Sequence, residues 1–218
     1  MTAKDSGGWL YYTIKFVLFI YYKLFFHLRC YGADKVPGET SGRGVILAPN
    51  HASYLDPPLL GVCAKRRVTF LAKEYLFNAF FVGWVLRTLG AVPIKTQADD
   101  FRNIRKLIKL LQQGRCIEVF PEGTRSPDGN LQEPESGVGF LAIKSGAAVI
   151  PVYIDGTYQA WPRGANFFKC HPVRVYLADP FVPALDKSLM QEKDPYAAVS
   201  RKIMAEIAEL KSKVLIQE

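Results

Sequence analysis

The sequence predicts an α/β protein with a mostly parallel central sheet, flanked by helices and preceded by an N-terminal helical segment. Three observations support this. Short apolar runs alternate with helical stretches from residue 43 onward, an aromatic segment precedes them, and no repeat or long linker divides the body of the chain. Strands separated by helical patterns favour a parallel sheet that is covered on both faces. We therefore expect an N-terminal segment over residues 1–35 and one domain over 36–218.

The segment over residues 8–31 is strongly aromatic and is interrupted by Lys15 and Lys23. Its longest charge-free run, 16–22, is far shorter than the roughly 18 apolar residues of a transmembrane span. It also lacks the small-residue cleavage site of a signal peptide. On a helix the lysines share one side with tyrosines, and Val17, Ile20, Tyr21, Leu24, Phe25 and Leu28 fill the opposite arc. This pattern is typical of a helix that lies in the headgroup layer of an anionic bilayer. The alternative is a core helix docked on the domain.

The body of the chain contains six β-rich apolar runs that we expect to form strands. They cover residues 43–49, 67–72, 91–95, 115–120, 147–153 and 172–178. Helices are expected between them over 56–64, 76–88, 98–113 and 136–145. The last helix, 193–216, places apolar residues such as Val199 and Ile203 on one stripe, which is typical of a helix that docks on a domain.

Composition limits the classes of partner. The net charge of +8 and the pI near 9.3 favour an anionic partner, which could be a nucleic acid, a membrane or an acidic substrate. No recognition-helix, zinc or RNP pattern is present, so we expect no nucleic-acid partner. The four cysteines form no CxxC pair and are expected to be reduced and mostly buried thiols. The three histidines have no zinc-ligand spacing with them, so no metal site is expected.

A histidine and an aspartate follow the first predicted strand, in the segment 50–56 (NHASYLD). Open α/β sheets bind their ligands at the ends of strands, and a histidine oriented by a carboxylate can act as a general base. On a continuous helix His51 and Asp56 would point in different directions, so they can meet only if the chain turns before Pro57. The alternative is that Asp56 caps a helix with Pro57 at its first position, and that His51 has no chemical role.

A second polar turn, 120–126 (FPEGTRS), follows another predicted strand. Gly123 permits close approach of the backbone to a ligand, and Thr124 and Arg125 offer donors to an anionic oxygen. A surface turn would explain the same residues. The strand over 147–153 contains Pro151, which indicates a sheet edge or a bulge and carries no functional information by itself.

Together, and in this order, these segments resemble the glycerophosphate acyltransferase family, most closely its bacterial 1-acylglycerol-3-phosphate acyltransferases. The resemblance covers roughly residues 40–160 and rests on NHxSxxD at 50–56 and FPEGTRS at 120–126. Further blocks resemble Lys73-Glu74 through Gly83, Gly90-Ala91 to Ile94, and the proline-containing strand Val149 to Val152. There are two departures. Thr96, beside Lys95, stands where the family usually has an arginine, and Glu135-Ser136 precede Gly137 where the family often has a lysine.

The resemblance implies an enzyme of phospholipid biosynthesis. It would move a fatty acyl chain from acyl-CoA or acyl carrier protein to the free hydroxyl of 1-acylglycerol-3-phosphate, giving phosphatidic acid, with no cofactor besides the donor. His51 and Asp56 would form the base pair, and Gly123 and Lys73 are the oxyanion candidates. The acceptor would be bound by Glu122, Gly123, Thr124 and Arg125. Of these, Arg125 suits the acceptor phosphate because its planar fork matches phosphate oxygens.

The expected location is the cytoplasmic face of the cell membrane, as a monotopic or peripheral protein on an anionic surface. The apolar stretch 75–89 could line a tunnel for the acyl chain, touch the bilayer, or form a plain core helix. Two functional alternatives stay open. The acceptor could be another lyso-lipid, such as a lyso-ornithine or lyso-phosphatidylglycerol lipid, or the chain could be a non-catalytic basic membrane-surface or nucleic-acid-binding protein.

Overall fold

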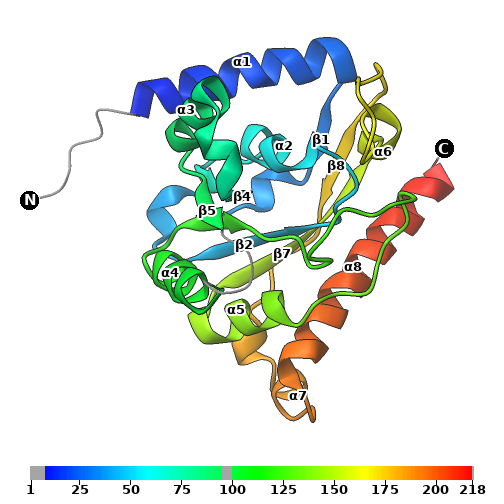
Figure 1. The fold of residues 1–218 in the computed structure, drawn as a ribbon. Coiled ribbons are helices and arrows are strands. Elements are labelled where there is room, and N and C mark those ends of the chain that lie inside the picture. Colours follow the sequence, from blue (N-terminus) through cyan, green and yellow to red (C-terminus); the bar gives the residue numbers. More distant parts are fainter. Residues whose placement is uncertain (1–7, 95–99, 218) are drawn as a thin grey trace, which may run out of the picture.

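The computed structural model describes residues 8–94 and 100–217, which form a six-stranded sheet between two layers of helices (Figure 1). The strands are β1 (Arg29–Tyr31), β2 (Val45–Pro49), β3 (Val68–Thr69), β4 (Leu71–Lys73), β5 (Val92–Ile94), β6 (Cys116–Glu118), β7 (Ala148–Asp155) and β8 (Arg174–Leu177). The helices are α1 (Gly8–Phe26), α2 (Asp56–Cys63), α3 (Phe80–Thr88), α4 (Asp100–Gln112), α5 (Gly137–Ser145), α6 (Thr157–Ala160), α7 (Lys187–Met190) and α8 (Pro195–Gln217).

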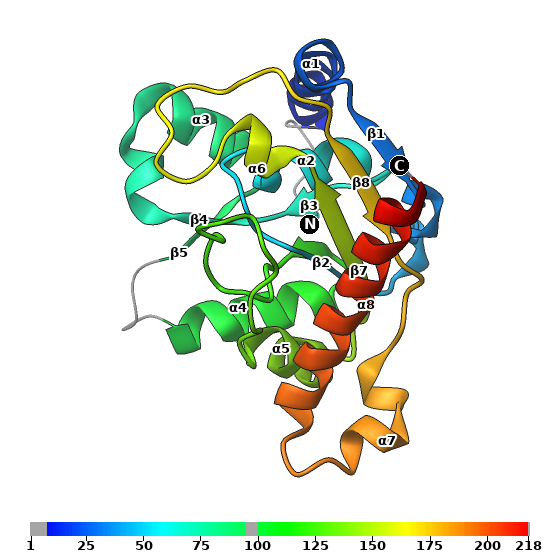
Figure 2. The same ribbon diagram turned by 90° about the vertical axis from the view of Figure 1, so that its right-hand side faces the viewer.

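The main sheet has the strand order β1-β8-β7-β2-β6-β3, and its neighbours are parallel except for the antiparallel pair β7 and β8. The prediction of a mostly parallel sheet is therefore confirmed. Alternate residues of β2 enter two different cores: Leu47 packs with α1 and α2, whereas Ile46 packs with α4, α5 and α8. Figure 2 shows these two groups of helices on opposite faces of the sheet.

The predicted strands 67–72 and 91–95 do not both join the main sheet. Val68 and Thr69 pair with β6, but β4 and β5 leave it and form a separate two-stranded parallel sheet. The departure has a packing cause, because Phe70 and Ala72 are buried in a third apolar cluster with Phe77 and Leu89. This cluster lies beneath α1 and α3. Residues 95–99, which include Lys95 and Thr96, lie outside the described residues.

Helix α1 docks on the domain along one side and leaves the other side exposed. Tyr11, Tyr22 and Phe26 are its buried side chains. Most of the apolar arc predicted from the sequence faces outward, with Val17 60% and Leu24 68% exposed, whereas Leu28 is buried in the core. Lys15, which the projection places on the same side as the tyrosines, faces the domain with Tyr11 and Tyr22, and its ammonium group donates a hydrogen bond to the carbonyl oxygen of Ala64. Within residues 8–94 and 100–217, no helix is long and apolar enough to cross a membrane.

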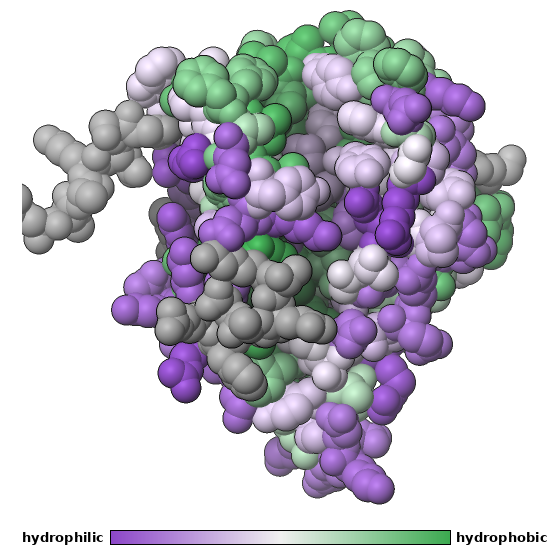
Figure 3. Space-filling model, viewed as in Figure 1, coloured by the Kyte–Doolittle hydropathy of each residue, from purple (hydrophilic) through white to green (hydrophobic). Residues whose placement is uncertain are grey.

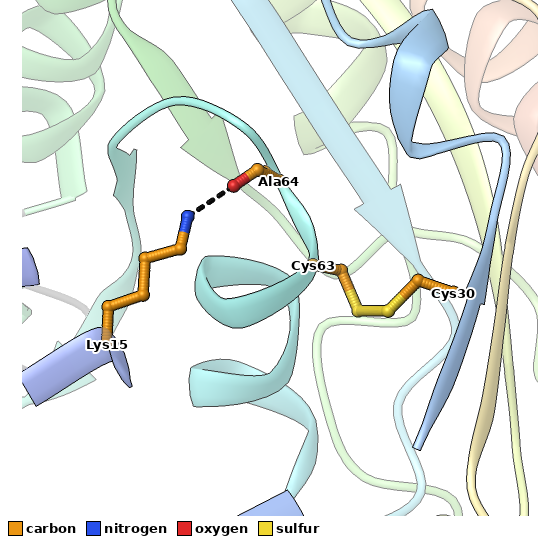
Figure 4. The surroundings of a disulfide bond; sticks show 4 residues. All are labelled: Lys15, Cys30, Cys63 and Ala64. Atoms are coloured by element: carbon orange, nitrogen blue, oxygen red, sulfur yellow. Dashed lines mark hydrogen bonds between the residues drawn. A yellow bond between two sulfur atoms is a disulfide. The ribbon is translucent and has the colours of Figure 1, made fainter. Parts of the chain in front are cut away.

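A disulfide joins Cys30 on β1 to Cys63 at the end of α2, so the prediction of four reduced thiols is wrong for this pair. Figure 4 shows the bridge close to the contact of Lys15 with Ala64. The two cysteines are 33 residues apart in sequence, but the packing of β1 beside α2 brings their Cα atoms to 6.1 Å. Cys116 is a buried free thiol, whereas Cys170 is free and exposed.

Candidate active site

The turn that carries His51 begins directly after β2, which is buried along its whole length. Asn50 fastens this end of the strand to β7: its side-chain amide donates to the carbonyl oxygen of Ile154 at 3.1 Å, and its side-chain oxygen accepts the N–H of Ile154 at 2.7 Å. The pairing satisfies polar groups that would otherwise be costly to bury. It also places His51 at the carboxyl end of two adjacent parallel strands.

The side chains of His51 and Asp56 meet at 2.9 Å between Nδ1 and Oδ2. The chain turns between them, and the carboxylate points back toward the residues that precede α2. The same Oδ2 accepts the backbone N–H groups of Ala52 and Ser53, each at 2.7 Å. Because an ionised carboxylate can only accept hydrogen bonds, we assign the proton to Nδ1 of His51. Nε2 is then left with a lone pair, as a general base requires.

The FPEGTRS segment wraps around His51. The ring of Phe120 stacks on the imidazole with centroids 3.7 Å apart and an interplanar angle of 20°. The backbone N–H of His51 donates to Oε1 of Glu122 at 3.1 Å, and the backbone N–H of Ser126 donates to the carbonyl oxygen of His51 at 2.8 Å. The two motifs meet because β2 and β6 are parallel neighbours that end at the same edge of the sheet.

Glu122 is buried and holds the backbone of His51 in place. Burial raises the pKa of its carboxyl to about 7, although the backbone N–H groups of His51 and Gln132 act in the opposite direction. Its second oxygen, Oε2, is buried and has no hydrogen-bond partner in the part of the chain that the structure describes. Glu122 thus contacts the histidine backbone, whereas the resemblance implies that it binds the acceptor.

Arg125 lies with its guanidinium over the ring of Tyr54, 3.8 Å from the ring centroid. Its Nη1 is buried and is without a hydrogen-bond partner among the described residues. A buried guanidinium nitrogen without an acceptor is costly, and a bound anion would satisfy it. Tyr54 was not singled out from the sequence, because its part in the site depends on this contact with a residue in a distant segment of the chain.

A cavity of about 400 Å³ opens beside His51 and joins the polar turn to an apolar region. His51, Lys73 and Arg125 stand at its polar part. Its apolar wall comes from β4, α3 and their surroundings, with Phe70, Leu76, Val85, Leu86 and Leu89 among the lining residues. A cavity with a few polar groups and an extended apolar wall suits a ligand that has a reactive head and a hydrocarbon chain.

The stretch 75–89 contributes both to the cavity and to the outer surface of the molecule. Leu76, Val85, Leu86 and Leu89 line the cavity, while the opposite side of α3 exposes Phe80 (95%) and Phe81 (70%). Figure 3 shows hydrophobic residues gathered at the top of the molecule, where Figure 1 places α1 and α3. The two helices therefore form one apolar surface next to the cavity.

The remaining predicted residues lie in two places, at the end of β4 and in the FPEGTRS turn. Lys73, at the end of β4, lines the cavity. Gly123 has a φ of +66°, and its N–H donates to the carbonyl oxygen of Phe120 at 3.2 Å, so this donor already closes a turn. Thr124 is exposed. Of the two oxyanion candidates, Lys73 is the one that faces the cavity.

Comparison with known proteins gives consistent results. Residues 27–155 match the family model described as Acyltransferase. The chain is 31% identical over 162 residues to the chloroplastic 1-acyl-sn-glycerol-3-phosphate acyltransferase LPAT1 of Arabidopsis thaliana, covering 72% of this chain and 44% of that protein. It is 26% identical to the 1-acyl-sn-glycerol-3-phosphate acyltransferase of Bacillus subtilis, over 86% of this chain and 89% of the relative. The chain thus spans less than half of the plant relative but most of the bacterial one.

A solved structure has the same fold. The crystal structure of the 1-acyl-sn-glycerophosphate (LPA) acyltransferase PlsC from Thermotoga maritima matches with a TM-score of 0.77 and 29% identity, covering 96% of this chain and 83% of that one. The likeness includes the curled sheet and the helices on both of its faces.

Proposed function

This chain belongs to the acyltransferase family, and we propose that it transfers a fatty acyl chain from an acyl thioester to the free hydroxyl of 1-acylglycerol-3-phosphate, giving phosphatidic acid. The observation that carries the proposal is the pairing of His51 with Asp56 at the polar part of a cavity whose remaining wall is largely apolar. The names of the plant, bacterial and structural relatives support this acceptor.

The transfer begins at His51. With Nδ1–H held by Asp56, Nε2 removes the proton of the acceptor hydroxyl as the oxygen attacks the thioester carbonyl. The C–O bond forms, and the carbonyl oxygen takes the negative charge of a tetrahedral intermediate. When the C–S bond breaks, the departing thiolate receives the proton from His51. No residue of the chain becomes acylated, because acceptor and donor react directly in one complex.

Two cationic side chains support these steps. Lys73 faces the cavity from the end of β4 and is the proposed donor to the oxyanion; such a donor typically contributes about 3–4 kcal/mol. Arg125 is the proposed contact of the acceptor phosphate, since its Nη1 is buried without a partner among the described residues. The acyl chain would lie along the wall formed by Leu76, Val85 and Leu86.

A panel of acceptors tests the assignment. The full chain is incubated with radiolabelled acyl-CoA or acyl carrier protein and with 1-acylglycerol-3-phosphate, a lyso-ornithine lipid or lysophosphatidylglycerol. We expect 1-acylglycerol-3-phosphate to give the highest kcat/KM. A second acceptor has a specific observation in its favour: the chain is 33% identical, over 56% of its length, to a lyso-ornithine lipid O-acyltransferase of Pseudomonas aeruginosa, covering 46% of that protein. A preference for the lyso-ornithine lipid would replace our assignment.

We further propose that the apolar surface of α1 and α3 seats the protein on one leaflet without crossing it. Phe16 is 63% and Phe80 95% exposed on neighbouring helices, beside the cavity that must receive lipid chains. Transferring such a side chain out of water contributes roughly 1.5–3 kcal/mol. The net charge of +8 adds attraction to an anionic leaflet.

Flotation on anionic vesicles tests the membrane contact. Phe16→Ser and Phe80→Ser should each weaken vesicle binding and lower activity on vesicle substrate more than on detergent-dispersed substrate. Leu185→Ser is the matched control, because Leu185 is 78% exposed but lies near α7, away from this surface. Equal vesicle binding by all three variants would refute this mode of association.

A further inference from the structure

A tight turn after α6 places Arg163 close to the candidate active site. The N–H of Ala165 donates to the carbonyl oxygen of Pro162 at 3.2 Å, and Gly164 at the third position has a φ of +86°. This is the geometry of a type II turn, in which Arg163 occupies the second position. The indole N–H of Trp161 donates to the carbonyl oxygen of Ala165 at 3.0 Å and closes the turn from outside.

The turn is bonded to the segment that carries His51. The hydroxyl of Ser53 donates to the carbonyl oxygen of Trp161 at 2.6 Å, and Ser53 also forms an isolated antiparallel bridge with Pro162. The ring of Tyr54 lies against that of Trp161, with centroids 5.4 Å apart. Ser53 is buried. These contacts fix the position of the turn relative to His51, although Arg163 itself is exposed on a surface loop.

Positive groups converge on the phenol of Tyr54. Arg125 lies over its ring at 3.8 Å. The hydrogen bond and the charge of Arg125 lower the pKa of this phenol, and the backbone N–H of Gly164 and the charge of Arg163 act in the same direction. Among the described residues, no carboxylate pairs with Arg125 or Arg163. Arg125 and Arg163 therefore bring positive charge to the same part of the site without a counter-ion among the described residues, as an anion site requires.

We propose that Arg163 is a specificity-determining residue that binds the phosphate of the acceptor together with Arg125. The inference rests on the proposed function and extends it to a residue outside both motifs. Arg163 would also compensate for the two departures in the sequence, since Thr96 and the Glu135-Ser136 pair stand where the resemblance implies cations. Arg163 supplies positive charge from another part of the chain, in the turn that follows α6.

The same phosphate chemistry is present on anionic bilayer lipids, so the experiment must separate the acceptor from the surface. Arg163→Ala, Arg163→Lys and Lys169→Ala are compared in detergent micelles of fixed composition. Lys169 is the matched control, because it is an exposed cation of the same loop. Each variant is given 1-acylglycerol-3-phosphate and a phosphate-free monoacylglycerol, and its binding to anionic vesicles is measured separately.

We expect Arg163→Ala to raise the KM for 1-acylglycerol-3-phosphate about fivefold, which corresponds to the loss of one partly exposed charge contact. The KM for monoacylglycerol and the KM for the donor should stay unchanged. Arg163→Lys should recover part of the loss, and Lys169→Ala should behave as wild type. Protection of the protein against thermal unfolding by glycerol 3-phosphate should weaken in Arg163→Ala, which gives a readout without turnover.

An unchanged preference for the phosphate-bearing acceptor in Arg163→Ala would overturn the inference while leaving the proposed function intact. Equal losses on both acceptors, accompanied by weaker vesicle binding, would assign Arg163 to the bilayer surface and would overturn it as well. Failure of the wild-type protein to acylate any acceptor would overturn both proposals.

Discussion

Replacing Asp56 by asparagine tests how the carboxylate supports His51. Three hydrogen bonds converge on a single oxygen of Asp56, from Nδ1 of His51 at 2.9 Å and from the N–H groups of Ala52 and Ser53 at 2.7 Å. In Asp56→Asn the new side chain can satisfy these three donors only by placing its carbonyl oxygen there. The Nδ1–H tautomer of His51 is then retained, and the substitution removes only the negative charge of the carboxylate. Considered from the sequence alone, a His–Asp pair suggests instead that asparagine would favour the wrong tautomer.

The expected loss of kcat follows from the distance between the imidazolium and the carboxylate. The imidazolium formed during transfer lies about 4 Å from the carboxylate charge, where attraction at an effective dielectric constant of about 20 amounts to about 4 kcal/mol. Loss of that stabilisation corresponds to a kcat about 10³-fold lower. The new amide nitrogen would occupy the place of Oδ1, which is buried without a partner among the described residues, at a stability cost of about 1–3 kcal/mol.

The assay is transfer of radiolabelled acyl groups from acyl-CoA at saturating acceptor, with circular dichroism to confirm the fold. Asp128→Asn is the matched control, because Asp128 is an exposed acceptor for Ser126 and Asn130 in the adjoining loop. A kcat for Asp56→Asn within about tenfold of wild type would refute the electrostatic argument. A loss as complete as that of a variant without His51 would indicate that the tautomer is lost after all.

The remaining predictions concern Arg125, Glu122 and the disulfide. Arg125→Ala should raise the acceptor KM about tenfold and leave the donor KM unchanged; a rise in donor KM would place Arg125 in the donor site. Burial raises the pKa of Glu122 from 4.5 to about 7, so the folded state keeps a proton that the unfolded state loses. Stability should therefore fall by about 3 kcal/mol as the pH rises between these values. The free energy of unfolding of Glu122→Gln, measured with urea at about pH 5 and pH 8, should not show this fall. Cys63→Ser should lower the free energy of unfolding by about 3–4 kcal/mol, because the bridge closes a loop with a sequence separation of 33; Cys170→Ser, at an exposed free thiol, should leave it unchanged.

Much of the fold was predictable because its signals are local. Strand β2 is a continuous apolar run, β6 and β7 are mostly apolar, and α2 begins at Asp56 with Pro57 in its first turn, so each boundary is marked by nearby residues. The meeting of His51 with FPEGTRS was predictable for a related reason, since parallel neighbouring strands bring their carboxyl ends to one edge.

Other features depend on contacts between distant segments and carry no local signal. A helical projection gives the angle of Lys15 around α1 but does not say which side of the helix faces the domain. The burial of Tyr11 and Tyr22 decides this, and it turns Lys15 toward Ala64. The pairing of Cys30 with Cys63 and the stacking of Arg125 on Tyr54 likewise arise from packing between elements.

In the proposed mechanism Nε2 of His51 activates the acceptor hydroxyl, and single-turnover transfer by His51→Ala measures this step on its own. The variant is mixed with radiolabelled acyl-CoA and 1-acylglycerol-3-phosphate, and the formation of phosphatidic acid is followed. His171→Ala is the control, since the His171 ring contacts the carbonyl oxygen of Pro172 and lies outside the site. We predict that folded His51→Ala transfers acyl groups about 10²–10⁴-fold more slowly than wild type, and that His171→Ala is unaffected. Transfer at the wild-type rate by folded His51→Ala would show that His51 is not the base.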